Sequence, residues 1–499
     1  MKSTILRISL FLFFSLSINA QSSYFNIIES EKFVDNYRNT SVNAVHTTDN
    51  NTTLVARTAK RKLIFEAYDE QAKNIFNVFT DLDKNETIAG EIFYNNQLKV
   101  FSVYTPSKTD RVINCYILDV LNKSIKKVEL FKTSVEKQQS LFSGQNKRQT
   151  NFAISDNEKF LAVATDNIKK HSNSYLVHVF DAHTLELLYT KDYYSNTDKF
   201  FSSSDMIIDN EGNVFALGKE YEEGKSEKIN GKPNYSFILT KVNENAFEST
   251  EVSLDENENI KSLRIIPNNE DLNLIGFYSE KNAHRIKGIV QFKINSKSLS
   301  QSDKKLNPLP TEVYADLYGD DKADKKKEKE LRSFYLDYVI EDDLGNIYLL
   351  AEEFYVTQTY VSTGMNGGYW STVYHYDNIL ISKISSEGNI LWGRSIFKKD
   401  SQPSYNAFVM ENKLHVLLNS GKDLKEKEDG RVKASKGFLE STSLYDFVYD
   451  ENGNVTHEKI QDNKNKTVYI PFLGNYKKDK FIMFNLSKNN KQLMMLVPK

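Results

Sequence analysis

The sequence predicts an all-β protein, and three observations carry this prediction. Aromatic residues are abundant, with 28 tyrosines and 31 phenylalanines, whereas proline occurs only 8 times. Short apolar runs rich in β-branched residues alternate with turns rich in Asn, Asp and Gly, which is the pattern of strands joined by tight connections. The 3.6-residue apolar periodicity of amphipathic helices is absent from almost the whole sequence.

The chain starts with a segment typical of secretion. Lys2 and Arg7 precede an apolar run from Ile8 to Ile18, and the small residue Ala20 follows shortly after it. This order predicts a signal peptide, residues 1–20, that is removed after Ala20. An N-terminal anchor that is retained is the alternative. We therefore expect a secreted or periplasmic protein.

Charge and cysteine content exclude several classes of function. Removal of residues 1–20 changes the formal net charge from −2 to −4, so no nucleic-acid partner is expected. No later segment reaches 18 consecutive apolar residues, so we expect no transmembrane segment after signal cleavage. Cys115 is the single cysteine, which excludes a disulfide framework and a Cys-based metal site. Its place in an apolar run predicts a small buried hydrophobe rather than a reactive thiol.

A hairpin with a polar turn repeats along the chain. Its clearest copies are Asp342–Leu350 and Asp209–Leu217, where Asp, Asn and Gly form a tight turn between two apolar runs. Six weaker copies have their turns at Thr48–Asn51, Tyr94–Gln97, Ser155–Lys159, Asn268–Asp271, Met410–Lys413 and Asn475–Asp479. The sequence thus predicts eight hairpins of this first type.

A second hairpin follows each of the first seven. Its clearest copies run from Ile379 through a turn at Ser385–Asn389, and from Leu444 through a turn at Asp450–Asn454. Each unit therefore has four strands, which we call a to d in chain order. Four-stranded meanders repeated in series predict the blades of a β-propeller, because stacked blades bury both faces of each sheet. A pair of β-sandwiches is the alternative.

The last unit lacks one strand. Its three apolar runs are Val468–Leu473, Lys480–Leu486 and Gln492–Val497, whereas the strand-like segment Tyr24–Glu29 has no unit of its own. We predict that this N-terminal strand completes the last blade, because an open ring would expose strand edges. The expected fold is one propeller domain over residues 21–499, with eight blades and a ring closed by the N-terminal strand. Seven blades is the alternative.

The two Gly-Asn hairpins carry a family resemblance. Asp209–Phe215 and Asp342–Tyr348 resemble the D-x-x-G-N-x-[YF] repeats of secreted bacterial β-propellers. Tyr376–Arg394, which contains NILISKISSEGNILWGR, is similar to a blade of uncharacterised propellers of this kind. The resemblance implies the fold and indicates function only weakly.

Long connections are predicted to gather on one face of the propeller. The a–b and c–d turns are short, whereas the long segments fall between strands b and c or between blades. These segments are Lys219–Asn234, Tyr355–Asp377, Ser420–Phe438, Thr133–Thr150 and Ser298–Arg332. We expect the binding face there, with neutral loop growth as the alternative. The mixed charge of Asp320–Glu330 predicts a solvated, mobile loop or a frayed helix.

The richest long segment is Tyr355–Tyr376, which alternates β-formers with hydroxyls around a Gly-Met-Asn-Gly-Gly tip. We predict that strands b and c extend into a protruding ribbon, whose aromatic side chains offer contact area with a polar handle. The predicted ligand-binding residues are Tyr360, Tyr369, Trp370, Tyr374, His375 and Tyr376. The alternative is that the ribbon folds over a neighbouring blade and its aromatics only pack.

No catalytic residue, metal site or cofactor is predicted. The sequence contains no nucleophile elbow, P-loop, dinucleotide fingerprint or H-E-x-x-H motif. Asp81–Asn85 begins like a calcium loop, but Glu86 stands where such a loop requires Gly. We expect a binding or interaction module that contacts a protein or glycan partner at the cell envelope through its long-loop face. The alternative is a carbohydrate-active enzyme, a lyase or a glycosidase, with its site on the same face.

Overall fold

The computed structural model describes most of the chain. The described residues are 24–135, 150–166, 174–194, 199–255, 257–268, 271–280, 285–327, 331–362, 368–429, 431–435 and 440–499. The predicted signal peptide, residues 1–20, lies outside them. Of the helices that are described, none combines the length and apolar character needed to cross a membrane.

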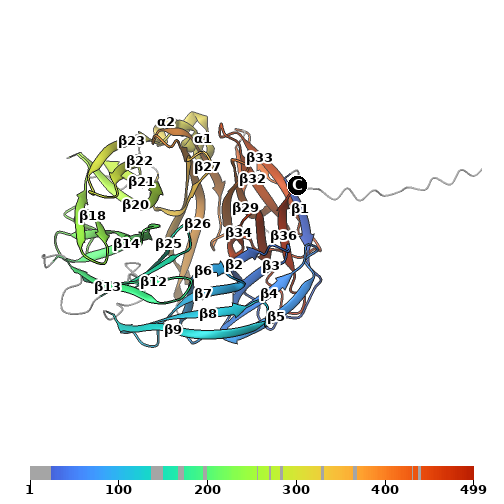
Figure 1. Ribbon diagram of the computed structural model, residues 1–499. Helices are drawn as coiled ribbons and strands as arrows, with labels where there is room; N and C mark the ends of the chain where they lie inside the picture. The colour runs from blue at the N-terminus through green and yellow to red at the C-terminus, as the bar shows by residue number, and fades with distance from the viewer. Residues whose placement is uncertain are drawn as a thin grey trace, which may run out of the picture.

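Eight four-stranded antiparallel blades form a ring (Figure 1), and the sheet of blade 6 carries two further short strands from the blade 7 connection. Blade 1 comprises β2 (Ser41–Thr47), β3 (Thr53–Ala59), β4 (Lys62–Tyr68) and β5 (Asn74–Asp81). Blade 2 comprises β6 (Glu86–Tyr94), β7 (Gln97–Tyr104), β8 (Asp110–Asp119) and β9 (Ser124–Ser134). Blade 3 comprises β10 (Thr150–Ile154), β11 (Phe160–Asp166), β12 (Ser174–Asp181) and β13 (Leu187–Tyr194). Blade 4 comprises β14 (Phe201–Ile208), β15 (Val214–Tyr221), β18 (Tyr235–Val242) and β19 (Phe247–Val252).

The second half of the ring repeats the same arrangement. Blade 5 comprises β20 (Glu258–Asn268), β21 (Asp271–Glu280), β22 (Gly288–Asn295) and β23 (Gln301–Pro308). Blade 6 comprises β24 (Phe334–Glu341), β25 (Ile347–Ser362), β26 (Gly368–Ile384) and β27 (Ile390–Lys398). Blade 7 comprises β28 (Tyr405–Met410), β29 (Lys413–Gly421), β32 (Thr442–Tyr449) and β33 (Val455–Asp462). Blade 8 comprises β34 (Asn475–Lys477), β35 (Lys480–Phe484), β36 (Leu493–Pro498) and β1 (Phe25–Glu29).

The N-terminal strand closes the ring, as predicted. β1 pairs antiparallel with β36, from Phe25 opposite Pro498 to Glu29 opposite Met494. Figure 1 shows this blue strand beside the red C-terminal strands. Because β1 supplies the missing fourth strand, blade 8 has the same four-stranded order as the others and the count is eight, not seven.

A buried ion cluster reinforces the closure. Arg57, which is 2% exposed, donates to Asp35 at 2.8 Å and to both carboxylate oxygens of Glu66 at 2.8 and 2.9 Å. Asp35 belongs to the segment after β1, whereas Arg57 and Glu66 lie in blade 1. The guanidinium also lies 5.2 Å from the ring centre of Phe484 in blade 8. This cluster therefore joins the first and last blades.

The a–b turn of blade 6, at Asp342, shows how the repeated Asp, Gly and Asn residues form a tight turn. The Asp342 carboxylate accepts backbone N–H bonds from Leu344 at 3.1 Å and Asn346 at 2.8 Å, and Gly345 adopts a φ of 77°. A left-handed φ suits Gly because it has no Cβ. Beneath the turn, Asp342 also forms a buried ion pair with Lys383 at 3.2 Å. The turn is thus held both by its own backbone and by strand c.

Two predicted segments differ from the structure. The expected first strand of blade 8, Val468–Leu473, contains the 3-10 helix η1 (Pro471–Leu473), and the strand lies at Asn475–Lys477 instead. Proline has no backbone N–H for a ladder but suits the first turn of a helix. The expected loop Ser298–Arg332 contains β23 and two helices, α1 (Thr311–Tyr318) and α2 (Asp320–Lys326).

Helix α1 precedes the charged run Asp320–Glu330 and is packed, whereas α2 shows that the first part of that run is a helix rather than a loop. Val313, Tyr314 and Leu317 are buried in one apolar cluster with residues of blades 5 and 6. Asp316 accepts two hydrogen bonds from Arg394 of β27, at 2.8 and 2.9 Å. The helix therefore packs between blades 5 and 6.

The connections differ in length at the two ends of the ring. The a–b and c–d turns lie at one end, which we call the short-turn end. The b–c and d–a connections lie at the other, which we call the long-connection end. The latter includes α1 and α2, the β16–β17 hairpin (Lys228–Ile229 with Lys232–Pro233), the blade 6 ribbon, and β30 (Lys425–Glu426) with β31 (Val432–Ala434).

The stability of the ring is expected to fall in mild acid because of a histidine between blades 2 and 3. His178 of β12 packs against Phe131 of β9, with 4.0 Å between ring centres, and burial lowers its pKa from 6.5 to about 4. The unfolded chain therefore binds a proton between pH 6.5 and 4 that the folded chain does not. The free energy of unfolding should fall across this window by on the order of 1–3 kcal/mol.

Urea unfolding at pH 7 and pH 4.5 measures the effect. Carboxylates also titrate in this range, so the comparison is made with His178→Gln, which lacks the ionisable ring. The variant should lose less stability than the parent between the two pH values. Equal losses would show that His178 does not contribute.

Candidate functional site

The protruding ribbon of blade 6 is the candidate site predicted from the sequence. β25 and β26 remain paired beyond the body of the blade, up to Ser362 opposite Gly368. The backbones of Tyr360 and Trp370 pair within this extension. The side chains of Tyr360, Tyr369 and Trp370 lie outside the described residues, so their predicted role stays a prediction.

An aromatic patch lies at the base of the ribbon. Tyr376 packs on Phe354 with 4.8 Å between ring centres, and Tyr374 lies parallel to Phe354 at 6.5 Å. Tyr335 of β24 meets the edge of the same Phe354 ring at 6.2 Å. Tyr335 and Tyr374 are 59% and 50% exposed. We call these four residues, Tyr335, Phe354, Tyr374 and Tyr376, the aromatic patch.

His375 points to the other face of the ribbon, because side chains alternate along a strand. It stacks on Tyr355 with 4.4 Å between ring centres, and its Nε2 lies 2.8 Å from the Thr357 hydroxyl. The Tyr355 hydroxyl in turn donates to Asp377 at 2.8 Å. The structure therefore groups Tyr374 and Tyr376 with the patch and separates His375 from them.

A cavity of about 470 Å³ opens beside the patch at the long-connection end. Its walls come from the starts of the inner strands β14, β20 and β24 and from the ends of β15 and β21. Tyr335 lines this cavity and also belongs to the aromatic patch. The cavity and the patch therefore form one continuous surface, which residue spacing could not have revealed because the walls come from three blades.

The lining of this cavity is basic and rich in hydroxyls. It contains three basic side chains, Lys219, Lys261 and Arg264, and one carboxylate, that of Glu227. Its hydroxyl residues are Ser202, Ser203, Ser204, Ser262 and Ser333. Such a lining suits a polar ligand that carries negative charge.

A polar cluster contacts the aromatic patch through the backbone of Tyr376. Lys398 donates to Glu352 at 2.7 Å and to the carbonyl oxygen of Tyr376 at 2.6 Å. Burial, only partly offset by Lys398, raises the pKa of Glu352 from 4.5 to about 7. Nearby, the Tyr405 hydroxyl donates to Asp337 at 2.8 Å. These contacts fix the base of the ribbon to blades 6 and 7.

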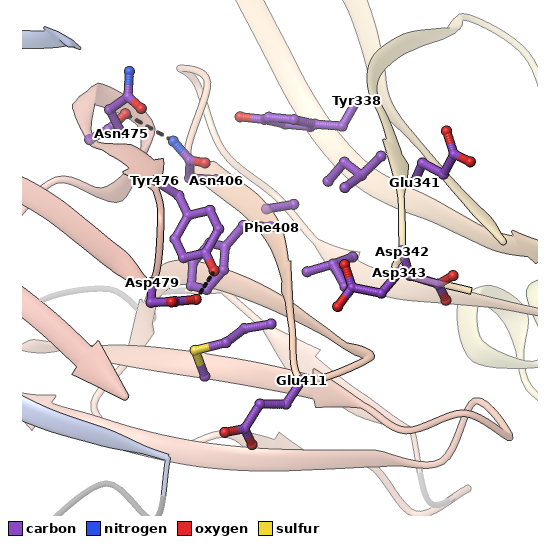
Figure 2. Close-up of a pocket in the computed structure, with 15 residues that line it drawn as sticks. Tyr338, Glu341, Asp342, Asp343, Asn406, Phe408, Glu411, Asn475, Tyr476 and Asp479 are labelled. Atoms are coloured by element: carbon purple, nitrogen blue, oxygen red, sulfur yellow. Dashed lines mark hydrogen bonds between the residues drawn. The ribbon is translucent and has the colours of Figure 1, made fainter. Parts of the chain in front are cut away.

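A second cavity, of about 540 Å³, lies at the short-turn end between blades 6, 7 and 8. Figure 2 shows the rings of Phe408 and Tyr476 lying face to face within it, 4.2 Å apart. Its charged side chains are all carboxylates, those of Glu341, Asp342, Asp343, Glu411 and Asp479. The two cavities therefore differ in the sign of their charge.

Cys115 is buried, and burial raises the pKa of its thiol to about 12, which agrees with the predicted buried hydrophobe. Among the described residues, no three His, Cys, Asp or Glu side chains are grouped as a metal ion requires.

Comparisons with known proteins find similar solved structures only. No family model and no curated protein matches the sequence. An oligogalacturonate lyase from Vibrio parahaemolyticus is 9% identical with a TM-score of 0.39, and the match covers 92% of this chain and 98% of the lyase. A polysaccharide lyase is 8% identical with a TM-score of 0.39, over 95% of this chain and 99% of that one. Dipeptidyl peptidase 4 from Porphyromonas gingivalis is 10% identical with a TM-score of 0.42, over 90% of this chain.

This chain spans only about 56% of that peptidase and about 55% of a prolyl endopeptidase that also matches. All these TM-scores lie below 0.5, and the identities are near 10%. The similarities therefore carry no inference about function. The eight-bladed architecture rests on the strand pairing itself.

Proposed function

We propose that this chain is an exported binding module that takes a glycan or protein partner at the long-connection end of its propeller. One observation supports the proposal above others: an exposed aromatic patch and a basic, hydroxyl-lined cavity share Tyr335 at this end. Aromatic side chains offer rigid contact area, and a few placed polar groups orient a ligand. The predicted secretion signal supports a partner at the cell envelope.

The ribbon provides the first test. Residues 359–371 are replaced by Asn-Gly, a two-residue turn that closes an antiparallel hairpin between the paired residues Gln358 and Thr372. The extension lies beyond the body of the blade, so the melting temperature should change by no more than a few degrees. Binding to an array of envelope glycans should weaken at least tenfold. A variant that no longer folds would show that the ribbon is structural.

A matched pair of point variants tests the patch itself. Tyr335→Ala removes an aromatic ring that is 59% exposed at the patch, and Phe79→Ala removes a ring of equal exposure on β5, the outermost strand of blade 1. Only Tyr335→Ala should reduce binding. Equal effects, or none, would contradict a site at this end.

The alternative is a carbohydrate-active enzyme, a lyase or a glycosidase, at the same end. The raised pKa of Glu352, about 7, is the observation that favours it, because catalytic acids have pKa values near the working pH. Release of new reducing ends or unsaturated products from polysaccharides, lost in Glu352→Gln, would support the enzyme. Tight binding without product release would support the binding module.

A further inference from the structure

The inner strands of the propeller carry irregularities at matching positions. The pairing of strands a and b shifts register near the start of strand a in blades 1, 2, 4, 5 and 6. In blade 5 the shift lies between Ile260 and Ser262, so Lys261 is the extra residue. A β-bulge re-aims a side chain and is common next to functional sites.

Close packing holds this bulge in place. Gly276 of β21 pairs with Leu263, just after the bulge, and a Cβ at Gly276 would fall 1.8 Å from the carbonyl oxygen of Ser262. The Ser262 hydroxyl also accepts the backbone N–H of Phe277 at 3.4 Å. The backbone next to Lys261 is therefore closely packed against β21.

Lys261 stands apart from the other basic residues of the cavity. Lys219 forms an ion pair with Glu227 at 2.8 Å and lies 4.1 Å from the ring centre of Tyr235. Arg264 lies 3.6 Å from a carboxylate oxygen of Asp205. Lys261 is half-buried, and it forms no ion pair or hydrogen bond with any side chain that the structure describes.

The surroundings of Lys261 make its unpaired positive charge unfavourable for the folded protein. Burial, and then the charge of Lys228, lower the pKa of Lys261 below its ordinary 10.5, with Lys219 acting in the same direction and Glu227 against it. A charged group that loses water without gaining a partner destabilises the folded protein. An anionic ligand in the cavity would remove that cost.

We propose that the cavity binds the acidic group of a charged polysaccharide, with Lys261 as its main contact and the aromatic patch holding the adjoining sugar rings. This inference rests on the proposed binding function and names its ligand class. The serine hydroxyls offer partners for sugar hydroxyls, and Tyr335 provides continuity from the acidic group to the patch. A carboxylate and a sulfate ester both fit the lysine, which acts as a point charge.

Calorimetric titration with four small probes tests the proposal. Trigalacturonate carries carboxylates, sulfated maltotriose carries sulfates, maltotriose is neutral, and triglutamate is an acidic peptide. Either acidic sugar should bind more tightly than maltotriose and triglutamate, and the better of the two identifies the acidic group. Failure of both acidic sugars to bind, or equal binding of triglutamate, overturns the proposal.

Variants assign the binding to the cavity. Lys261→Met should weaken binding of the acidic sugar about 10–100-fold, the effect of losing one charge-assisted contact. Lys261→Arg should retain most of the affinity. Lys126→Met, at an exposed lysine on the outermost strand of blade 2, is the control and should change nothing. Lys261→Gln keeps a polar side chain if the Met variant fails to fold.

The two proposals fail in different ways. One outcome is that maltotriose or another neutral glycan binds best, and that Tyr335→Ala but not Lys261→Met abolishes binding. The proposal of an acidic ligand would then be wrong, and the proposed binding function would be supported. If neither variant changes any binding, both proposals fail.

Discussion

Replacing Arg57 by Met is expected to lower the free energy of unfolding by about 3–5 kcal/mol, the usual effect of removing one partner from a buried ion cluster. The change leaves the carboxylates of Asp35 and Glu66 buried without their guanidinium. It also removes the contact between Arg57 and Phe484 that joins the first blade to the last. Urea unfolding monitored by circular dichroism measures the loss.

Lys62→Met is the matched control, since Lys62 pairs with Asp81, whose side chain is 79% exposed, in the same blade. Exposed pairs contribute about 0–1 kcal/mol, so this variant should remain close to the parent. A loss of less than about 1 kcal/mol for Arg57→Met would mean that the cluster does not stabilise the closed ring. Asp35→Asn, which removes one carboxylate charge and keeps its shape, should have a smaller effect than Arg57→Met.

Replacing Gly276 by Ala is expected to destabilise the protein by about 2–3 kcal/mol, near the top of the range for overpacking. The added Cβ would meet backbone atoms only, with Ser262 O at 1.8 Å, Ser262 C at 2.6 Å and Leu263 Cα at 2.9 Å. No side chain can rotate away to relieve this contact, so β20 and β21 must separate. That movement displaces Lys261, and binding of an acidic ligand should weaken with it.

Gly421→Ala is the control, since the nearest atom to its Cβ is Ser435 O at 3.1 Å and a shift of a few tenths of an ångström suffices. Thermal unfolding and ligand titration of both variants give the two readouts. A Gly276→Ala protein with parental stability and affinity would show that the bulge is not held as described.

The blades were predictable because their signals are local. Each a–b turn carries its own chemistry, as at Asp342, whose side chain binds the backbone of its own turn. The closing strand was predictable by counting, since one unit lacked a strand and one strand lacked a unit. Helix α1 was not predicted, because Val313, Tyr314 and Leu317 are buried only by residues of blades 5 and 6. The apolar spacing of these three residues fits a helix, but eight residues are too few for the pattern to stand out in the sequence.

The residues grouped at the candidate site were predictable only in part for the same reason. Tyr374 and Tyr376 stood out by composition, and the structure places both in the aromatic patch. Tyr335 and Lys261 lie about 40 and 110 residues earlier in the chain and come together with them only in the ring. The bulge at Lys261 has no sequence signature, although Gly276 in an otherwise apolar strand is the kind of signal that marks a close backbone approach.

The pairing of β1 with β36 also determines when blade 8 can be completed during folding. The partners of residues 25–29 are residues 494–498, so the first strand cannot pair until the chain has been synthesised through residue 498. Until then a nascent protein holds at most seven complete blades and an unpaired edge, a state prone to aggregation. A chaperone that delays folding until β36 is available would therefore favour closure, and loss of residues 494–498 would leave an open ring.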